Sequence, residues 1–95
     1  MQTVTIKFLQ SVCDRINKAT NSPMVPYVKG DDGKHHAQIG NYHLSQAYGG
    51  VSLHRMYNEG GGVSDVFSCG HVSKRNLSER MFAFINGIDS AKVQA

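Results

Sequence analysis

Hydrophobic side chains recur every three or four residues near the start of the chain. Between Thr5 and Ala19 they fall at Ile6, Leu9, Val12, Cys13 and Ile16, which is the spacing of one face of a helix. The segment Thr20-Asn21-Ser22-Pro23 then ends the pattern, because short polar side chains compete for backbone hydrogen bonds and the residue before proline avoids the helical region. The pattern therefore predicts a first helix over residues 5–19.

A second helical pattern follows Ser73, whose hydroxyl suits the N-cap position. Its apolar face consists of Leu77, Met81, Phe84, Ile85 and Ile88. Gly87 is the residue type that often closes a helix in a left-handed conformation. We therefore expect the second helix to end near Gly87 and residues 89–95 to fray.

Between the two helical patterns, strand-forming residues alternate with turns. Two firm strands are predicted over residues 36–46 and 51–58, a third over 63–68, and a short edge strand over 25–29, where Pro26 excludes a central position in a sheet. A turn at Gly30-Asp31-Asp32-Gly33 follows the edge strand. The side chains expected to fill a half-buried pleated surface are Tyr42, Leu44, Val51, Leu53 and Tyr57.

The register of the main hairpin follows from matching like residues across the two strands. A two-residue loop at Tyr48-Gly49 sets these pairs: Leu44 with Leu53, Gln46 with Val51, Tyr42 with Arg55, His43 with His54, and Ser45 with Ser52. A loop at Gly49-Gly50 would pair unlike residues on both faces. The first register requires a positive φ at Tyr48, so a longer loop over residues 47–50 stays open as a compromise.

Together these elements predict an α+β fold: a helix, a three- to four-stranded antiparallel sheet and a second helix. We expect both helices on one face of the sheet, since this arrangement covers the apolar faces of both. The 95 residues are the length of one small domain, spanning residues 1–95 without an internal repeat or linker.

Composition narrows the class of protein. With 40% hydrophobic and 18% charged residues, the chain is expected to fold and not to be disordered. The formal charge of +3 comes from ten Lys and Arg against seven Asp and Glu, without a basic run, and gives a mild preference for acidic partners.

Cys13 and Cys69 are too few for a disulfide framework, which favours free thiols and a cytoplasmic setting. The sequence has no basic leader and no run of 18 apolar residues, so neither secretion nor membrane insertion is expected.

Four short segments carry a resemblance to known proteins: Gly40-Asn41-Tyr42-His43-Leu44, Ala47-Tyr48-Gly49-Gly50, Asn58-Glu59-Gly60-Gly61-Gly62 and Lys74-Arg75. Through them, residues 27–88 resemble a group of small, mostly uncharacterised proteins encoded by tailed bacteriophages and prophages. The resemblance implies a phage or prophage origin and action in the cytoplasm of a bacterial host. It implies no catalytic residue, ligand or cofactor.

The main hairpin contains the candidate binding residues. Tyrosine and arginine are enriched at binding hot spots, and an exposed tyrosine on a glycine turn has little structural reason to be aromatic. The predicted binding set is Tyr48, Arg55, His43 and His54. The first functional hypothesis is a non-enzymatic protein-interaction module that binds a host or phage protein, as a monomer or small homo-oligomer.

An alternative function uses the basic start of the second helix. Lys74 and Arg75 place positive charge at the positive end of the helix dipole, which costs a little stability. Residues at such an unfavourable position can mark a contact site. Lys74, Arg75 and Arg80 along one side of this helix are therefore the candidate nucleic-acid-binding residues. The element order is also that of double-stranded RNA-binding domains, but the chain lacks their lysine-rich cluster, so the similarity is one of topology.

Metal and catalytic sites are weaker hypotheses. His43 and His54 could share a metal ion with His35, His36, Cys69 or His71. Structural zinc sites usually have paired ligands at short spacing, which are absent, so no metal or cofactor is expected. Cys69 and a histidine could form a nucleophile and base, yet no spacing favours that pairing, and we do not expect an enzyme.

Overall fold

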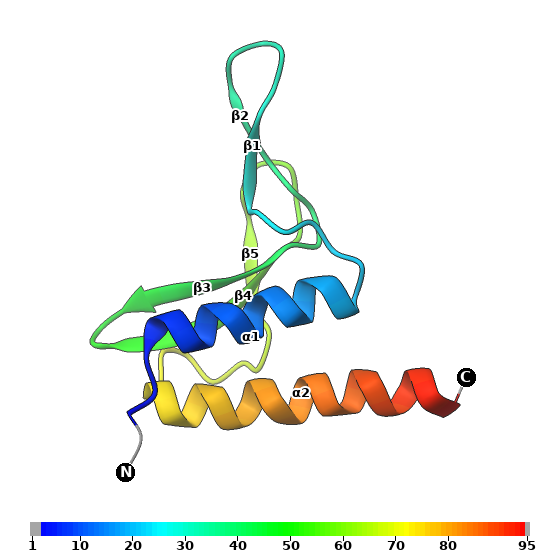
Figure 1. Cartoon of the computed structure of the whole chain (residues 1–95). Helices are drawn as coiled ribbons and strands as arrows, with labels where there is room; N and C mark the ends of the chain where they lie inside the picture. The colour runs from blue at the N-terminus through cyan, green and yellow to red at the C-terminus, as the bar shows by residue number, and fades with distance from the viewer. Residues whose placement is uncertain (1–2, 95) are drawn as a thin grey trace.

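Two helices lie side by side, with their N-terminal ends on the same side of the molecule (Figure 1). The computed structural model describes residues 3–94. Helix α1 spans Ile6–Ala19, and the hydroxyl of Thr5 caps it by accepting the amide of Phe8 at 3.1 Å. Helix α2 spans Lys74–Gln94, and the hydroxyl of Ser73 accepts the amide of Asn76 at 3.1 Å. Both caps satisfy backbone donors that a helix leaves unpaired at its start.

The end of α2 differs from the prediction, because the helix continues through Gly87 to Gln94. The predicted helix end at Gly87 and the fraying of residues 89–94 are therefore wrong, while Ala95 lies outside the described residues. Glycine inside a helix costs only about 1 kcal/mol relative to alanine. Contacts with α1 support the last turns: Asp89 lies 4.0 Å from Arg15, and the amine of Lys92 donates to the carbonyl of Ala19.

The main sheet is antiparallel and contains β3 (Tyr42–Ala47), β4 (Gly50–Met56) and β5 (Val63–Asp65), in that order. The predicted register of β3 and β4 is confirmed in every pair, including Leu44 with Leu53 and His43 with His54. The loop has two residues, Tyr48 at φ 55° and Gly49 at φ 74°. This turn matches the twist of the flanking strands because both residues have positive φ.

The predicted strand over residues 36–46 is broken into two elements that belong to different sheets. Its first part is β2 (His35–Ala37), which pairs with β1 (Tyr27–Lys29) to form a separate two-stranded ribbon. The break lies at Gly40, which has φ 93° and donates its amide to the carbonyl of Met56 at 2.8 Å. A left-handed glycine turns the chain sharply, so the strand direction changes there. The predicted edge strand is confirmed over three residues.

Strand β5 is also shorter than predicted, ending at Asp65 and not at Ser68. The carboxylate of Asp65 accepts the amide of Phe67 at 3.3 Å and the amide of Gly70 at 2.7 Å. These bonds stabilise a turn after Asp65, because a short acidic side chain can replace a backbone acceptor.

One core contains side chains from both helices and from strands β3 and β4. Its buried members are Leu9, Val12, Cys13, Ile16, Tyr42, Val51, Leu53, Leu77, Met81 and Ile85, with Leu44 packed against them. The α+β class is therefore confirmed. Tyr57 does not join this surface and is 60% exposed. Within residues 3–94, neither helix combines the length and apolarity needed to cross a bilayer.

Candidate interaction surface at the hairpin tip

The β3–β4 turn places Tyr48 outside the body of the molecule. Its side chain is 97% exposed, as the binding hypothesis requires. The ring of Tyr48 meets the ring of His71 edge-on, with 5.8 Å between centroids. The chain thus places an aromatic side chain in a left-handed conformation that tyrosine seldom adopts.

Three imidazoles continue from Tyr48 across the sheet face opposite the core. The ring of His71 lies 5.9 Å from that of His54, which lies 6.0 Å from that of His43. His71 also hydrogen-bonds Ser45 through Nε2 at 3.0 Å. We call Tyr48, His43, His54 and His71 the tip surface.

His71 was absent from the predicted binding set and appeared only as a possible metal ligand. It reaches the tip surface because two backbone bonds of 2.8 Å join Val72 to Val51 and hold the connection before α2 against β4. No local sequence signal shows that the connection between β5 and α2 returns to the β3–β4 hairpin.

Two histidines of the tip surface, His43 and His54, are shifted toward the neutral form. Burial, followed by the proximity of His54, lowers the pKa of His43. Burial also lowers the pKa of His54, assisted by His71 and opposed by Asp65. Burial acts to raise the pKa of Asp65, but hydrogen bonds led by the Gly70 amide outweigh it and hold that pKa below its usual value. Neutral imidazoles can both donate and accept hydrogen bonds to a partner.

The proposed metal ligands do not converge. Within residues 3–94, no group of three or more His, Cys, Asp or Glu side chains is positioned to hold a metal ion. His35 and His36 lie in the ribbon, where His36 pairs with Asp32 at 3.0 Å. The thiol of Cys69 donates to the carbonyl of Gly70 at 3.5 Å. The thiol of Cys13 is buried, which raises its pKa to about 12 and disfavours the nucleophilic thiolate.

Arg55 does not lie with the other predicted binding residues. Its guanidinium carbon is 4.9 Å from the ring centroid of Tyr42, on the sheet face that carries the core, and its Nε donates to the carbonyl of Gly40 at 3.4 Å. The alternation of a strand places Arg55 and His54 on opposite faces. The structure therefore brings together Tyr48, His43 and His54, and separates Arg55 from them.

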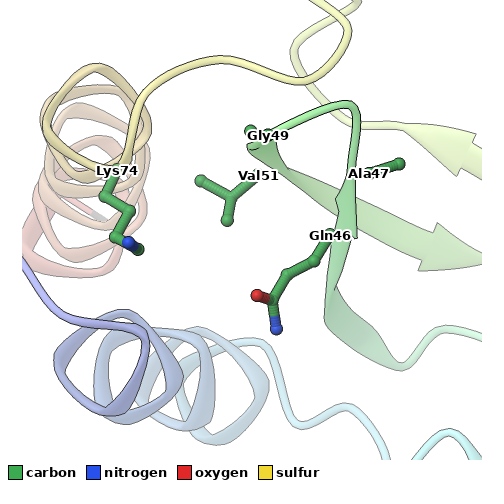
Figure 2. Close-up of a pocket in the computed structure, with 6 residues that line it drawn as sticks. Gln46, Ala47, Gly49, Val51 and Lys74 are labelled. Carbon is green, nitrogen blue, oxygen red and sulfur yellow. The ribbon is translucent and has the colours of Figure 1, made fainter.

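A pocket of about 350 Å³ lies between the hairpin tip and the start of α2. Figure 2 shows the side chains of Lys74, Gln46 and Val51 directed toward one space, with Gly49 and Gly50 also in its lining. Lys74 thus places a cation beside the hairpin turn, on the sheet face that carries the core, and none of the described residues lining the pocket is acidic.

The three predicted nucleic-acid-binding cations do not share one side of α2. At about 100° per residue, Arg75 and Arg80 are separated by about 140° around the helix. Lys74 is directed toward the pocket, whereas Nε of Arg80 donates to Asn76 at 2.7 Å. Lys74 and Arg75 remain near the tip, at the start of the helix.

Comparison with protein-family models, with curated proteins and with solved structures finds no match to this chain. The resemblance to phage and prophage proteins therefore stays a prediction.

Proposed function

We propose that the chain is a non-enzymatic protein-binding module of phage or prophage origin, acting in the cytoplasm of a bacterial host. Its tip surface contacts a host or phage protein. The observation that carries this proposal is Tyr48, an aromatic side chain 97% exposed at a left-handed turn position. Asparagine or glycine would form the same turn with less strain, so the aromatic ring is better explained by a contact outside the chain.

The neighbouring residues suit a protein partner. Tyrosine rings provide large contact area at low conformational cost. The imidazoles add hydrogen-bonding groups, with the rings of His43 and His71 each within 6.0 Å of the ring of His54, centroid to centroid. The pocket beside the tip has Lys74 as its cation. We expect it to receive a carboxylate side chain of the partner, because an ammonium group pairs with a carboxylate.

The test is capture from host lysate followed by titration of the captured protein. Immobilised chain is incubated with lysate, and each specifically retained protein is purified and titrated against free chain. Tyr48→Ala should weaken binding at least about tenfold, as expected for a hot-spot aromatic residue. Tyr57→Ala is the matched control, since Tyr57 is also exposed but lies outside the tip surface. No specific capture, or equal binding by both variants, would contradict the proposal.

Nucleic-acid binding is the second candidate function. It is favoured by Lys74 and Arg75, which occupy the first turn of α2 without an acidic neighbour there. Binding through phosphates weakens as salt rises, because it releases counterions. Anisotropy titrations against duplex DNA, duplex RNA and single strands should then show salt-dependent binding that Lys74→Ala with Arg75→Ala removes. Arg80→Ala, on another flank of α2, should leave the affinity unchanged. Absence of binding at low salt ends this candidate.

A further inference from the structure

A groove lies between the C-terminal parts of the two helices. Its volume is about 320 Å³, close to the lower end of the range for small-molecule sites. The described residues of its lining belong to α1 and α2; they are Arg15, Lys18, Ala19, Ile85, Asp89 and Lys92. We call it the helix-end groove. The hairpin tip is at the opposite side of the molecule, near the N-terminal ends of both helices (Figure 1).

The lining of the helix-end groove is positively charged. Arg15, Lys18 and Lys92 face a single acid of the described lining, Asp89, so the formal excess is two positive charges. Asp14 lies about 100° around α1 from Arg15, outside that lining. When Asp14 is counted as well, an excess of one positive charge remains. The groove is therefore expected to attract anions.

Capping of α1 accounts for only one of these cations. Cations near a helix C-terminus often bond its last carbonyls. Here each of the last four carbonyls of α1 already accepts a hydrogen bond: those of Ile16, Asn17 and Lys18 from the amides of Thr20, Ser22 and Asn21 at 2.8–3.3 Å, and that of Ala19 from the amine of Lys92. The side chains of Arg15 and Lys18 are not needed for this purpose.

The cations also retain donors for a ligand. Nη2 of Arg15 lies 4.0 Å from Oδ2 of Asp89, well beyond the distance of about 2.9 Å in a charge-assisted hydrogen bond. Within residues 3–94, neither the guanidinium of Arg15 nor the amine of Lys18 donates a hydrogen bond. The amine of Lys92 has three donors and uses one of them for Ala19. A guanidinium and two amines can therefore donate into one groove.

A phosphate monoester matches this set of donors. It carries about 1.5 to 2 negative charges at pH 7 and three strong acceptor oxygens. A guanidinium can bond two of these oxygens at once, which leaves the third for the amines. A carboxylate has one charge and two oxygens, too few to engage all three cations fully. Ile85 and Ala19 supply an apolar part of the lining for the organic portion of the ligand.

We infer that the helix-end groove binds a small phosphate monoester. Arg15 holds two phosphate oxygens, and Lys18 and Lys92 hold the third. Asp89 attracts the guanidinium of Arg15 from the other helix, but it also repels the phosphate and so limits the affinity. The site acts separately from the tip surface, because the two lie at opposite ends of the helices (Figure 1).

NMR titration of the isotope-labelled chain at constant ionic strength tests the site. The three ligands are inorganic phosphate, adenosine 5′-monophosphate and adenosine. Both ligands that carry phosphate should bind saturably and shift the amide signals around Arg15 and Asp89. Adenosine should not bind, because it has the same organic group without the phosphate.

Variants locate the binding. Arg15→Gln and Lys18→Gln should each weaken adenosine 5′-monophosphate binding at least about tenfold, since each removes hydrogen bonds between charged groups. Lys7→Gln is the matched control: it changes the net charge equally, but Lys7 lies about two turns earlier on α1 and outside the groove. Asp89→Asn should tighten binding about threefold, because it removes one exposed charge that repels the ligand. Circular dichroism verifies that each variant keeps its helices.

Four outcomes would overturn the inference. They are the absence of binding by both phosphate-bearing ligands, equal binding of adenosine and its monophosphate, equal losses in Lys7→Gln and Arg15→Gln, and binding of duplex DNA at this groove without binding of either small ligand. None of these measurements involves a protein partner, so their failure is independent of the proposed function of the tip surface.

Discussion

The side-chain amide of Asn17 bonds both backbone groups of Tyr42, joining α1 to the outer edge of β3. Its Oδ1 accepts the Tyr42 amide at 2.8 Å and its Nδ2 donates to the Tyr42 carbonyl at 2.9 Å. Both residues are buried. One helix side chain therefore supplies the two bonds that a neighbouring strand would make, and it satisfies the edge of the sheet at that position.

Asn17→Ala should lower the free energy of unfolding by about 3 kcal/mol, because it leaves the buried amide of Tyr42 without an acceptor and weakens the bonding of its carbonyl. The carbonyl keeps the thiol of Cys13 as a donor at 3.2 Å, so the loss arises mainly at the amide. Urea denaturation measures the change. Gln10→Ala is the control, since Gln10 bonds Asp14 on the exposed side of α1; it should alter stability by at most about 0.5 kcal/mol. Equal midpoints for the two variants would show that the Asn17 bonds contribute little.

Tyr48→Asn should stabilise the fold by about 0.5 kcal/mol while weakening partner binding. Asparagine followed by glycine is strongly preferred in a turn with two positive φ values, and a left-handed tyrosine costs about 1 kcal/mol, of which loss of the contact with His71 offsets part. Thermal or urea denaturation and the partner titration measure the two effects separately. Tyr57→Asn should bring no such gain, because Tyr57 is not among the residues with positive φ. A destabilised Tyr48→Asn variant would mean that the ring serves the fold and not a partner.

The sequence predicted local pairing well because the causes of pairing are local. The register around Tyr48-Gly49 follows from like residues opposing one another, and this logic already placed Arg55 on the same face as Leu53. The same pattern therefore places Arg55 and His54 on opposite faces of the hairpin. The ribbon was not predictable in the same way, since the break at Gly40 depends on a bond to Met56, sixteen residues later along the chain.

The same distinction explains the tip surface. Tyr48 was found from the turn that carries it, whereas His71 arrives through the pairing of Val72 with Val51, a contact across 21 residues. The end of α2 likewise depends on Asp89 and Lys92 contacting α1. Sequence periodicity describes one helix at a time and cannot include such contacts.

Gly87→Ala should raise the free energy of unfolding by about 0.5–1 kcal/mol, because alanine replaces glycine inside a helix. A Cβ at Gly87 meets nothing within 4 Å, so no clash opposes the gain. Gly49→Ala is the matched control: it also meets nothing within 4 Å, but its φ of +74° is strained for alanine and should cost stability. Denaturation midpoints compare the two. If Gly87→Ala destabilises the chain as Gly49→Ala does, the helix ends at Gly87 after all.

The stability of the fold should decline as the pH falls from about 7.5 to about 5.5. Burial lowers the pKa of His43 and of His54 in the folded chain. The unfolded imidazoles, with a pKa of about 6.5, then bind protons that the folded ones resist, so protonation favours the unfolded state. The decline continues until the pH passes the folded pKa values. Asp65, whose pKa is also lowered, contributes stability that disappears only below the usual carboxyl range, outside this interval.

The variant His43→Asn with His54→Asn should lose most of this slope, because asparagine does not titrate. Urea denaturation at pH 8, 7, 6 and 5.5 gives the free energy of unfolding for both proteins, with pH 8 as the reference at which the imidazoles are neutral in both states. The free energy of unfolding of the variant, minus that of the unaltered chain, should increase at each lower pH. Parallel curves would place the pH dependence on other groups, and would mean that His43 and His54 titrate alike in the folded and unfolded chains.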